Sequence, residues 1–148
     1  MGNDGELEIG LSTIHGKGDH HEQERDRVGL YGMDLTYSWR GKGFQRLLWR
    51  NEAIFNDRER ATHDRRTWGF YSAVNWRWDQ YWDAGLRYDW VEPSARKPKA
   101  EDMGTFALTR SLTEETRLRL ELSHDFKHDY MATIQFIFGL GPHAHPLE

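Results

Sequence analysis

Hydrophobic and polar residues alternate one by one along most of this chain. In residues 81–93, YWDAGLRYDWVEP, apolar side chains take every second position, and charged residues or glycine stand between them. Neighbouring side chains of a β-strand point to opposite faces of the sheet, so the pattern predicts a strand with one apolar and one charged face. The same pattern recurs and predicts eight strands, at residues 5–15, 27–40, 44–57, 67–79, 81–92, 103–113, 116–126 and 130–140.

The connections between the expected strands alternate in length. Long, charged segments occupy residues 15–27, 57–66 and 92–102, and a segment of intermediate length occupies 124–130. Short turns occupy residues 41–43, 79–80 and 113–115. An even number of strands, with short turns at one end and longer loops at the other, is typical of outer-membrane barrels. We therefore predict one all-β domain over residues 1–148, an antiparallel up-and-down transmembrane β-barrel of about eight strands, with residues 141–148 as a periplasmic tail.

The alternation assigns the large apolar side chains to one face of the predicted sheet. Aromatic residues on this face fall near both ends of the strands, with aliphatic residues between them. Lipid-facing surfaces of membrane barrels have this arrangement, because amphipathic rings favour the headgroup region. An eight-stranded barrel is also too narrow to hold so many large groups inside. We expect this face to contact lipid, and its members include Tyr31, Leu35, Trp39, Trp49, Phe55, Trp68, Trp76, Trp82, Leu86, Trp90, Leu120 and Phe138.

The opposite face carries arginines and acidic residues in similar numbers. Buried charges require partners of opposite sign, so the near balance predicts mutual pairing inside the barrel. Eight strands leave an interior only wide enough for side chains, which favours a closed and filled barrel. The other interpretation is a segment of a larger barrel, whose polar face would line water. The expected interior charge network is Arg46, Arg50, Glu52, Arg77, Asp83, Arg87, Asp89, Arg117, Arg119 and Glu121.

A few residues depart from this sorting. The alternation places polar Asn51 and Ser72 on the apolar face, together with Arg110. Arg110 lies near a strand end, from which its long side chain can reach the membrane surface. Phe44, Leu48 and Ile54 fall on the polar face instead.

Three segments carry a resemblance to a known group of proteins. At LYGMDLTYSW (30–39), AGLRYDWVEP (84–93) and IQFIFGLGPHAHPLE (134–148), the sequence resembles the C-terminal barrel portion of bacterial outer-membrane proteins described as porin-like or as zinc-regulated TonB-linked receptors. The resemblance implies that the chain is the C-terminal part of a longer barrel. Such barrels usually finish on an aromatic residue, whereas here Phe138 is followed by ten more residues.

Composition narrows the functional classes. The net charge of −4 gives no reason to expect nucleic acid as a partner, and the absence of cysteine excludes disulfides and thiol chemistry. No run of about 18 apolar residues is present, so no membrane helix is expected. The first ten residues lack a basic region followed by an apolar one. We therefore expect the export signal of an outer-membrane protein to have been removed or to lie upstream.

Histidines in the long connections are candidates for metal binding. His20, His21, His124 and His128 stand beside acidic residues, and two adjacent loops could offer them to Zn²⁺. The alternative is that they are ordinary residues of solvated loops, because their spacing defines no closed ligand set. No other cofactor is expected. Ser123 and His124 are neighbours on a strand and point apart, so they form no nucleophile–base pair, and we expect no enzymatic activity.

These expectations combine into one function and one alternative. The expected function is that of a non-enzymatic bacterial outer-membrane β-barrel protein, porin-like or part of a metal-uptake or transport barrel. Its expected partners are outer-membrane lipid, the barrel-assembly machinery and the N-terminal remainder of a larger barrel. The alternative is a soluble lipocalin-like barrel, with the aromatic face turned inward around an apolar ligand.

Overall fold

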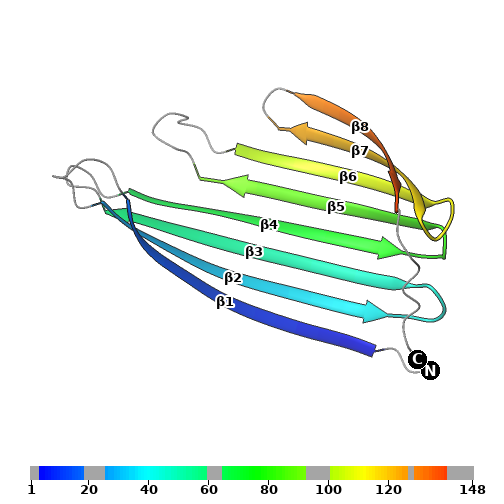
Figure 1. The fold of residues 1–148 in the computed structure, drawn as a ribbon, viewed down its shortest axis with the longest axis horizontal. Coiled ribbons are helices and arrows are strands. Elements are labelled where there is room, and N and C mark those ends of the chain that lie inside the picture. Colours follow the sequence, from blue (N-terminus) through cyan, green and yellow to red (C-terminus); the bar gives the residue numbers. More distant parts are fainter. Residues whose placement is uncertain (1–3, 19–25, 60–64, 93–100, 127–128, 140–148) are drawn as a thin grey trace.

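The structure is a single antiparallel sheet in which every strand pairs with the next one along the chain (Figure 1). It is a computed structural model and describes residues 4–18, 26–59, 65–92, 101–126 and 129–139. No helix among these residues is long and apolar enough to cross a membrane. The predicted all-β, up-and-down order is confirmed, with strands β1 (Asp4–Gly18), β2 (Asp26–Arg40), β3 (Arg46–Glu59), β4 (Arg65–Arg77), β5 (Trp82–Val91), β6 (Glu101–Ser111), β7 (Thr116–Asp125) and β8 (Tyr130–Phe138).

The first four strands run further into the expected long connections than predicted. Residues 57–66 were expected to form a loop, but β3 continues to Glu59 and β4 begins at Arg65. An ion pair between Arg66 Nε and Asp57 Oδ1, at 3.4 Å, joins the two strands there. Charged side chains do not end a ladder whose backbone hydrogen bonds can continue. The prediction was wrong at these ends because it took charge as a sign of a loop.

The turn between β2 and β3 is longer than predicted, so β3 starts later than expected. Gly43 has a φ of +66°, a conformation that glycine adopts without steric cost. The N–H of Gly41 donates to the carbonyl of Gln45 at 2.9 Å and closes the turn. Phe44 and Gln45 therefore belong to the turn, and β3 starts at Arg46 rather than at residue 44.

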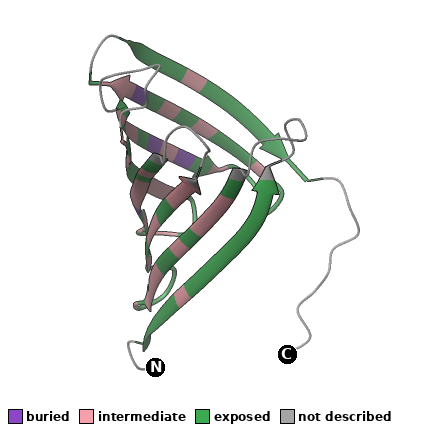
Figure 2. Cartoon of the chain, turned by 90° about the vertical axis from the view of Figure 1, so that its left-hand side faces the viewer, coloured by how far each residue is buried: buried purple, intermediate pink, exposed green. Residues whose placement is uncertain are grey.

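The sheet is bent into an arc whose two edge strands stay apart (Figures 1 and 2). Contacts between strands of the described chain join only consecutive pairs, and none joins β1 to β8. Closure of these eight strands into a barrel therefore stays a prediction. The turns β2–β3, β4–β5 and β6–β7 lie at one end of the sheet, here called the turn end, and the opposite end is the loop end.

The register confirms the predicted division into two faces. On the apolar face, Tyr37, Trp49, Val74 and Leu86 follow one another in register across four strands. On the polar face, the corresponding positions are Thr36, Arg50, Ala73 and Arg87. The most buried residues of the described chain are all small and on the polar face, namely Ala73, Ala107, Thr109 and Ser123. Side chains converge on the inside of a curved sheet, so the polar face is the concave one.

Candidate functional site

A row of aromatic rings crosses the apolar face near the loop end. Trp68 and Trp90 have ring centroids 4.4 Å apart, and Tyr31 lies 6.2 Å from Phe55. Towards the last strand, the rings of His124 and Tyr130 stack at 4.1 Å. The upper aromatic row comprises Tyr31, Phe55, Trp68, Phe70, Tyr88, Trp90, Phe126 and Tyr130.

A second row of aromatic rings crosses the same face near the turn end. The rings of Trp78 and Trp82 stack with centroids 6.4 Å apart. The guanidinium of Arg110, which the alternation placed among apolar residues, lies 5.3 Å from the Trp82 ring as a cation–π contact. The lower aromatic row comprises Trp39, Trp76, Trp78, Trp82, Phe136 and Phe138.

The separation between the two rows is the same in four of the strands. In four strands, an aromatic residue of the upper row and one of the lower row stand eight residues apart. Eight residues of strand span about 27 Å. The side chains between the rows are mostly aliphatic and exposed, with Leu86 63% and Ile134 75% exposed. The four pairs are Tyr31 and Trp39, Trp68 and Trp76, Trp82 and Trp90, and Tyr130 and Phe138.

Both rows run obliquely to the strands, and they do so in the same sense. Following the register from Tyr130 in β8 back to β2 leads to Leu35, four residues nearer the turn end than Tyr31. In the lower row, Trp82 and Phe136 share a level beyond that of Trp39. The rows are thus two parallel boundaries that cross tilted strands.

One polar spot interrupts the apolar face between the rows. The indole Nε1 of Trp49 donates to the hydroxyl of Ser72 at 3.1 Å, which explains why a serine is tolerated at this position. Asn51 is the cross-strand neighbour of Ser72. The amide nitrogen of Asn51 is buried and has no hydrogen-bond partner among the described residues. An unpaired buried donor of this kind costs about 1–3 kcal/mol.

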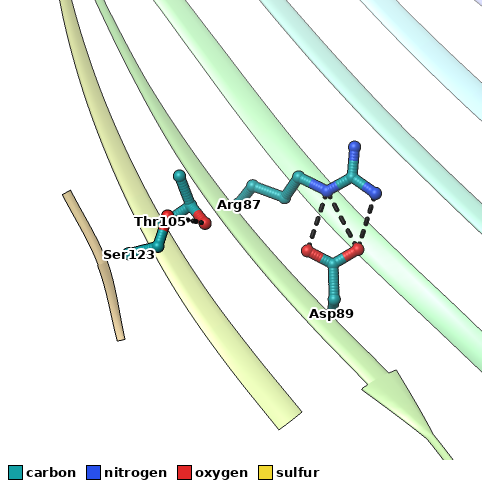
Figure 3. A network of polar contacts seen from close by, with 4 residues as sticks. All are labelled: Arg87, Asp89, Thr105 and Ser123. Atoms are coloured by element: carbon teal, nitrogen blue, oxygen red, sulfur yellow. Dashed lines mark hydrogen bonds and ion pairs between the residues drawn. The ribbon is translucent and has the colours of Figure 1, made fainter. Parts of the chain in front are cut away.

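The polar face carries ion pairs, most of them within one strand. Arg87 donates three hydrogen bonds to Asp89, the shortest from Nη2 at 2.6 Å, and also lies 4.3 Å from the Tyr71 ring (Figure 3). Arg119 Nη2 donates to Glu121 at 2.8 Å. These partners stand two residues apart and so share a face. A longer pair of 3.8 Å crosses between strands, from Arg77 to Asp83.

The predicted network is therefore paired only in part. All ten of its residues lie on the polar face, but no ion pair joins Arg46, Arg50, Glu52 or Arg117 to any other described residue. The register explains this, because Arg40, Arg46 and Arg77 are cross-strand neighbours, and Asp34 faces Glu52. Equal numbers of the two signs did not place all of them side by side, and mutual pairing inside a closed barrel stays a prediction.

A hollow of about 380 Å³ lies on the polar face and receives side chains from β3 to β7. Its floor is formed by Ala73, Gly85 and Ala107, whose side chains are small or absent. Thr105 adjoins them and exchanges a 3.0 Å hydrogen bond with Ser123 (Figure 3). Sequence reasoning missed this hollow, although small residues on the polar side of three consecutive strands were a usable signal. Its rim carries Arg50, Arg87, Arg119, Asn75, Asp89 and Glu121.

The predicted zinc ligands are not brought together in the described chain. His20, His21 and His128 lie outside the described residues. His124 stacks on Tyr130, with its Nδ1 3.3 Å from the carbonyl oxygen of Asp129. Within residues 4–18, 26–59, 65–92, 101–126 and 129–139, no three His, Cys, Asp or Glu residues are grouped to hold a metal ion. The zinc site stays a prediction.

Comparison with known proteins gives one informative relative. An uncharacterized protein of Aquifex aeolicus (strain VF5) is 25% identical over 170 aligned residues, which cover 93% of this chain. The match covers 36% of that protein, so the chain spans about a third of the length of its relative. No family model and no solved structure matches the chain. The resemblance to porin-like and zinc-regulated TonB-linked proteins stays a prediction.

Proposed function

We propose that this chain forms a section of the wall of a bacterial outer-membrane β-barrel, with its apolar face against lipid and its concave polar face towards water. The observation that carries the proposal is the pair of parallel, oblique aromatic rows. A lipid bilayer is a slab with two parallel surfaces, and the strands of outer-membrane barrels cross it at a tilt of about 35–45°. Two planar surfaces crossing tilted strands produce rows that shift together, as these do.

The distance between the rows fits the same slab. Eight residues span about 27 Å along a strand, and a tilt of about 35–45° reduces the vertical height to roughly 19–22 Å. The apolar band of outer-membrane barrels is about 25 Å tall, with aromatic residues at both surfaces. A packed soluble core needs neither the equal spacing in four strands nor a band of mostly aliphatic residues between two aromatic rows.

The proposed barrel is wider than eight strands. The sheet is an open arc, and Arg87 keeps about half of its side chain exposed (49%) on the concave side. The similarity to a longer protein supports the same choice, because this chain matches 36% of it. Further strands would then pair with β1 or β8, and the polar face would line an aqueous passage. In this role the wall is non-enzymatic, and its partners are outer-membrane lipid, the barrel-assembly machinery and the remaining strands.

The lipocalin-like alternative requires the opposite curvature. A soluble barrel with an apolar ligand inside would bend towards its aromatic face. Here the buried small residues and the hollow lie on the charged face instead. This geometry favours lipid contact over enclosure of an apolar ligand.

Detergent dependence tests the proposal. We expect the refolded chain to be β-rich and monodisperse in detergent micelles, and to precipitate or self-associate when the detergent is removed. Size-exclusion chromatography with light scattering and far-UV circular dichroism measure both. A β-rich monomer that persists in buffer without detergent would contradict the proposal.

A further inference from the structure

The hollow on the polar face has hydrogen-bond donors on its rim that no described residue uses. Arg50 makes no ion pair within the described chain. The Nε of Arg119 is buried and has no hydrogen-bond partner there. The side chain of Asn75 lies over Gly85, where a larger residue would clash, since a Cβ at Gly85 would stand 2.8 Å from Asn75 Oδ1.

The acidic residues of the rim are already engaged. Both oxygens of Asp89 accept hydrogen bonds from Arg87, and Oε2 of Glu121 accepts one from Arg119. The rim therefore holds three arginines against two acids, a net charge of +1. A metal cation would find its carboxylate ligands occupied, whereas an anion would find free donors.

The positions of the arginines suit a ligand that lies between them. Arg50 and Arg87 occupy the same register level, separated by Ala73 on the intervening strand. Ala73 carries only a methyl group, which is too short to separate the two longer side chains, and neighbouring groups cover it to 8% exposure. Adjacent strands lie about 4.8 Å apart, so Arg50 and Arg87 flank a gap of two strand spacings.

The geometry points to a binding site for an oxyanion in this hollow, with Arg50 as the principal donor and Arg119 on the same rim. Guanidinium groups bind phosphate and carboxylate oxygens through paired, charge-assisted hydrogen bonds. The volume of about 380 Å³ exceeds that of a single phosphate, so the site accepts a small organic phosphate or carboxylate. The inference gives the proposed aqueous passage a preferred class of solute, and this role rests on the proposed function. Binding of an anion in the hollow does not depend on the proposed function.

The test uses the refolded 148-residue chain with ¹⁵N-labelled arginine, titrated with inorganic phosphate and observed through the arginine Nε–H signals. A parallel titration with acetate separates phosphate from carboxylate preference, and sodium chloride at matched ionic strength corrects for screening. We expect saturable shifts of the Arg50 and Arg119 signals and little change at Arg46. Arg50→Gln should weaken phosphate binding at least tenfold. Arg46→Gln, four residues away on the same strand and face but outside the hollow, should change it less than twofold.

Arg50→Lys guards against a variant that does not fold, because it keeps the charge and loses only the planar fork of donors. We expect it to bind phosphate more weakly than the wild type and more tightly than Arg50→Gln. Uniform, non-saturating shifts at all arginines would overturn the inference, as would equal affinities of Arg50→Gln and the wild type. Loss of the site in a chain that still requires detergent leaves the membrane proposal standing. Saturable phosphate binding by a chain that stays monomeric without detergent would support the anion site and contradict the membrane proposal.

Discussion

The two faces of this sheet are built from the same strands but follow opposite rules. The apolar face leaves many of its large side chains exposed, such as Trp49 and Trp68, and its ring contacts form two parallel rows. The polar face buries small residues such as Ala73 and Ala107 and places charged groups above them. In a water-soluble sheet the large apolar groups would be the buried ones. The difference supports the proposal that the apolar face contacts lipid.

The two faces also differ in the contacts that their polar residues make. On the apolar face, Ser72 has the indole of Trp49 as a partner, and Arg110 lies over the Trp82 ring at a row. On the polar face, Arg50 and Arg117 need no ion pair in the described chain, as expected for groups in contact with water. Asn51 is the exception on the apolar face, since its amide nitrogen has no hydrogen-bond partner among the described residues.

The largest expected effect comes from a charge placed between the rows. Leu86→Arg should reduce the stability of the vesicle-inserted chain by about 2–4 kcal/mol, since an arginine at the bilayer midplane is costly. Trp90→Arg, on the same strand and face but in the upper row, should cost only about 0–1 kcal/mol. Urea unfolding from vesicles measures both. Equal losses would mean that the face has no depth-dependent environment.

An intermediate effect of the opposite sign is expected at Asn51. Asn51→Leu should stabilise the inserted chain by about 1–2 kcal/mol, because it removes a buried amide nitrogen that has no partner. Ser72→Ala is the matched control at the neighbouring position and should destabilise by about 1 kcal/mol, since Trp49 loses its acceptor. The same unfolding assay applies. If Asn51→Leu destabilises the chain, the apolar face holds a polar contact outside the described residues.

The smallest effect is expected on the polar face. Arg87→Ala should cost no more than about 1 kcal/mol, because the Arg87 side chain is half exposed and its pair with Asp89 is screened by water. In a closed, filled eight-stranded barrel the same change would strand a desolvated carboxylate and cost about 3–5 kcal/mol. A loss in the larger range would therefore favour the closed barrel over the wide one.

The features that depend on the two-residue alternation could be predicted from the sequence. The number, order and faces of the strands follow from the alternation, which is why Leu86 and Arg87 were assigned to opposite faces correctly. Strand ends were less predictable, because Asp57 and Arg66 extend a ladder while having the composition of a loop. Closure and ion pairing were not predictable. Closure depends on strands that are distant in the chain. The alternation assigns Arg87 to the polar face, but it does not determine that Asp89 is its partner.

Spin-label accessibility tests directly whether the apolar face contacts lipid and the polar face contacts water, as proposed. The chain has no cysteine, so single substitutions Leu86→Cys and Thr36→Cys can each carry one nitroxide label without a background signal. Leu86 lies between the aromatic rows, and Thr36 lies on the opposite face at a similar depth. In vesicles, we predict that the Leu86 label collides mainly with oxygen, which concentrates in the bilayer. The Thr36 label should collide mainly with a water-soluble nickel complex. Equal accessibility at both sites, or a preference of the Leu86 label for the nickel complex, would contradict the account.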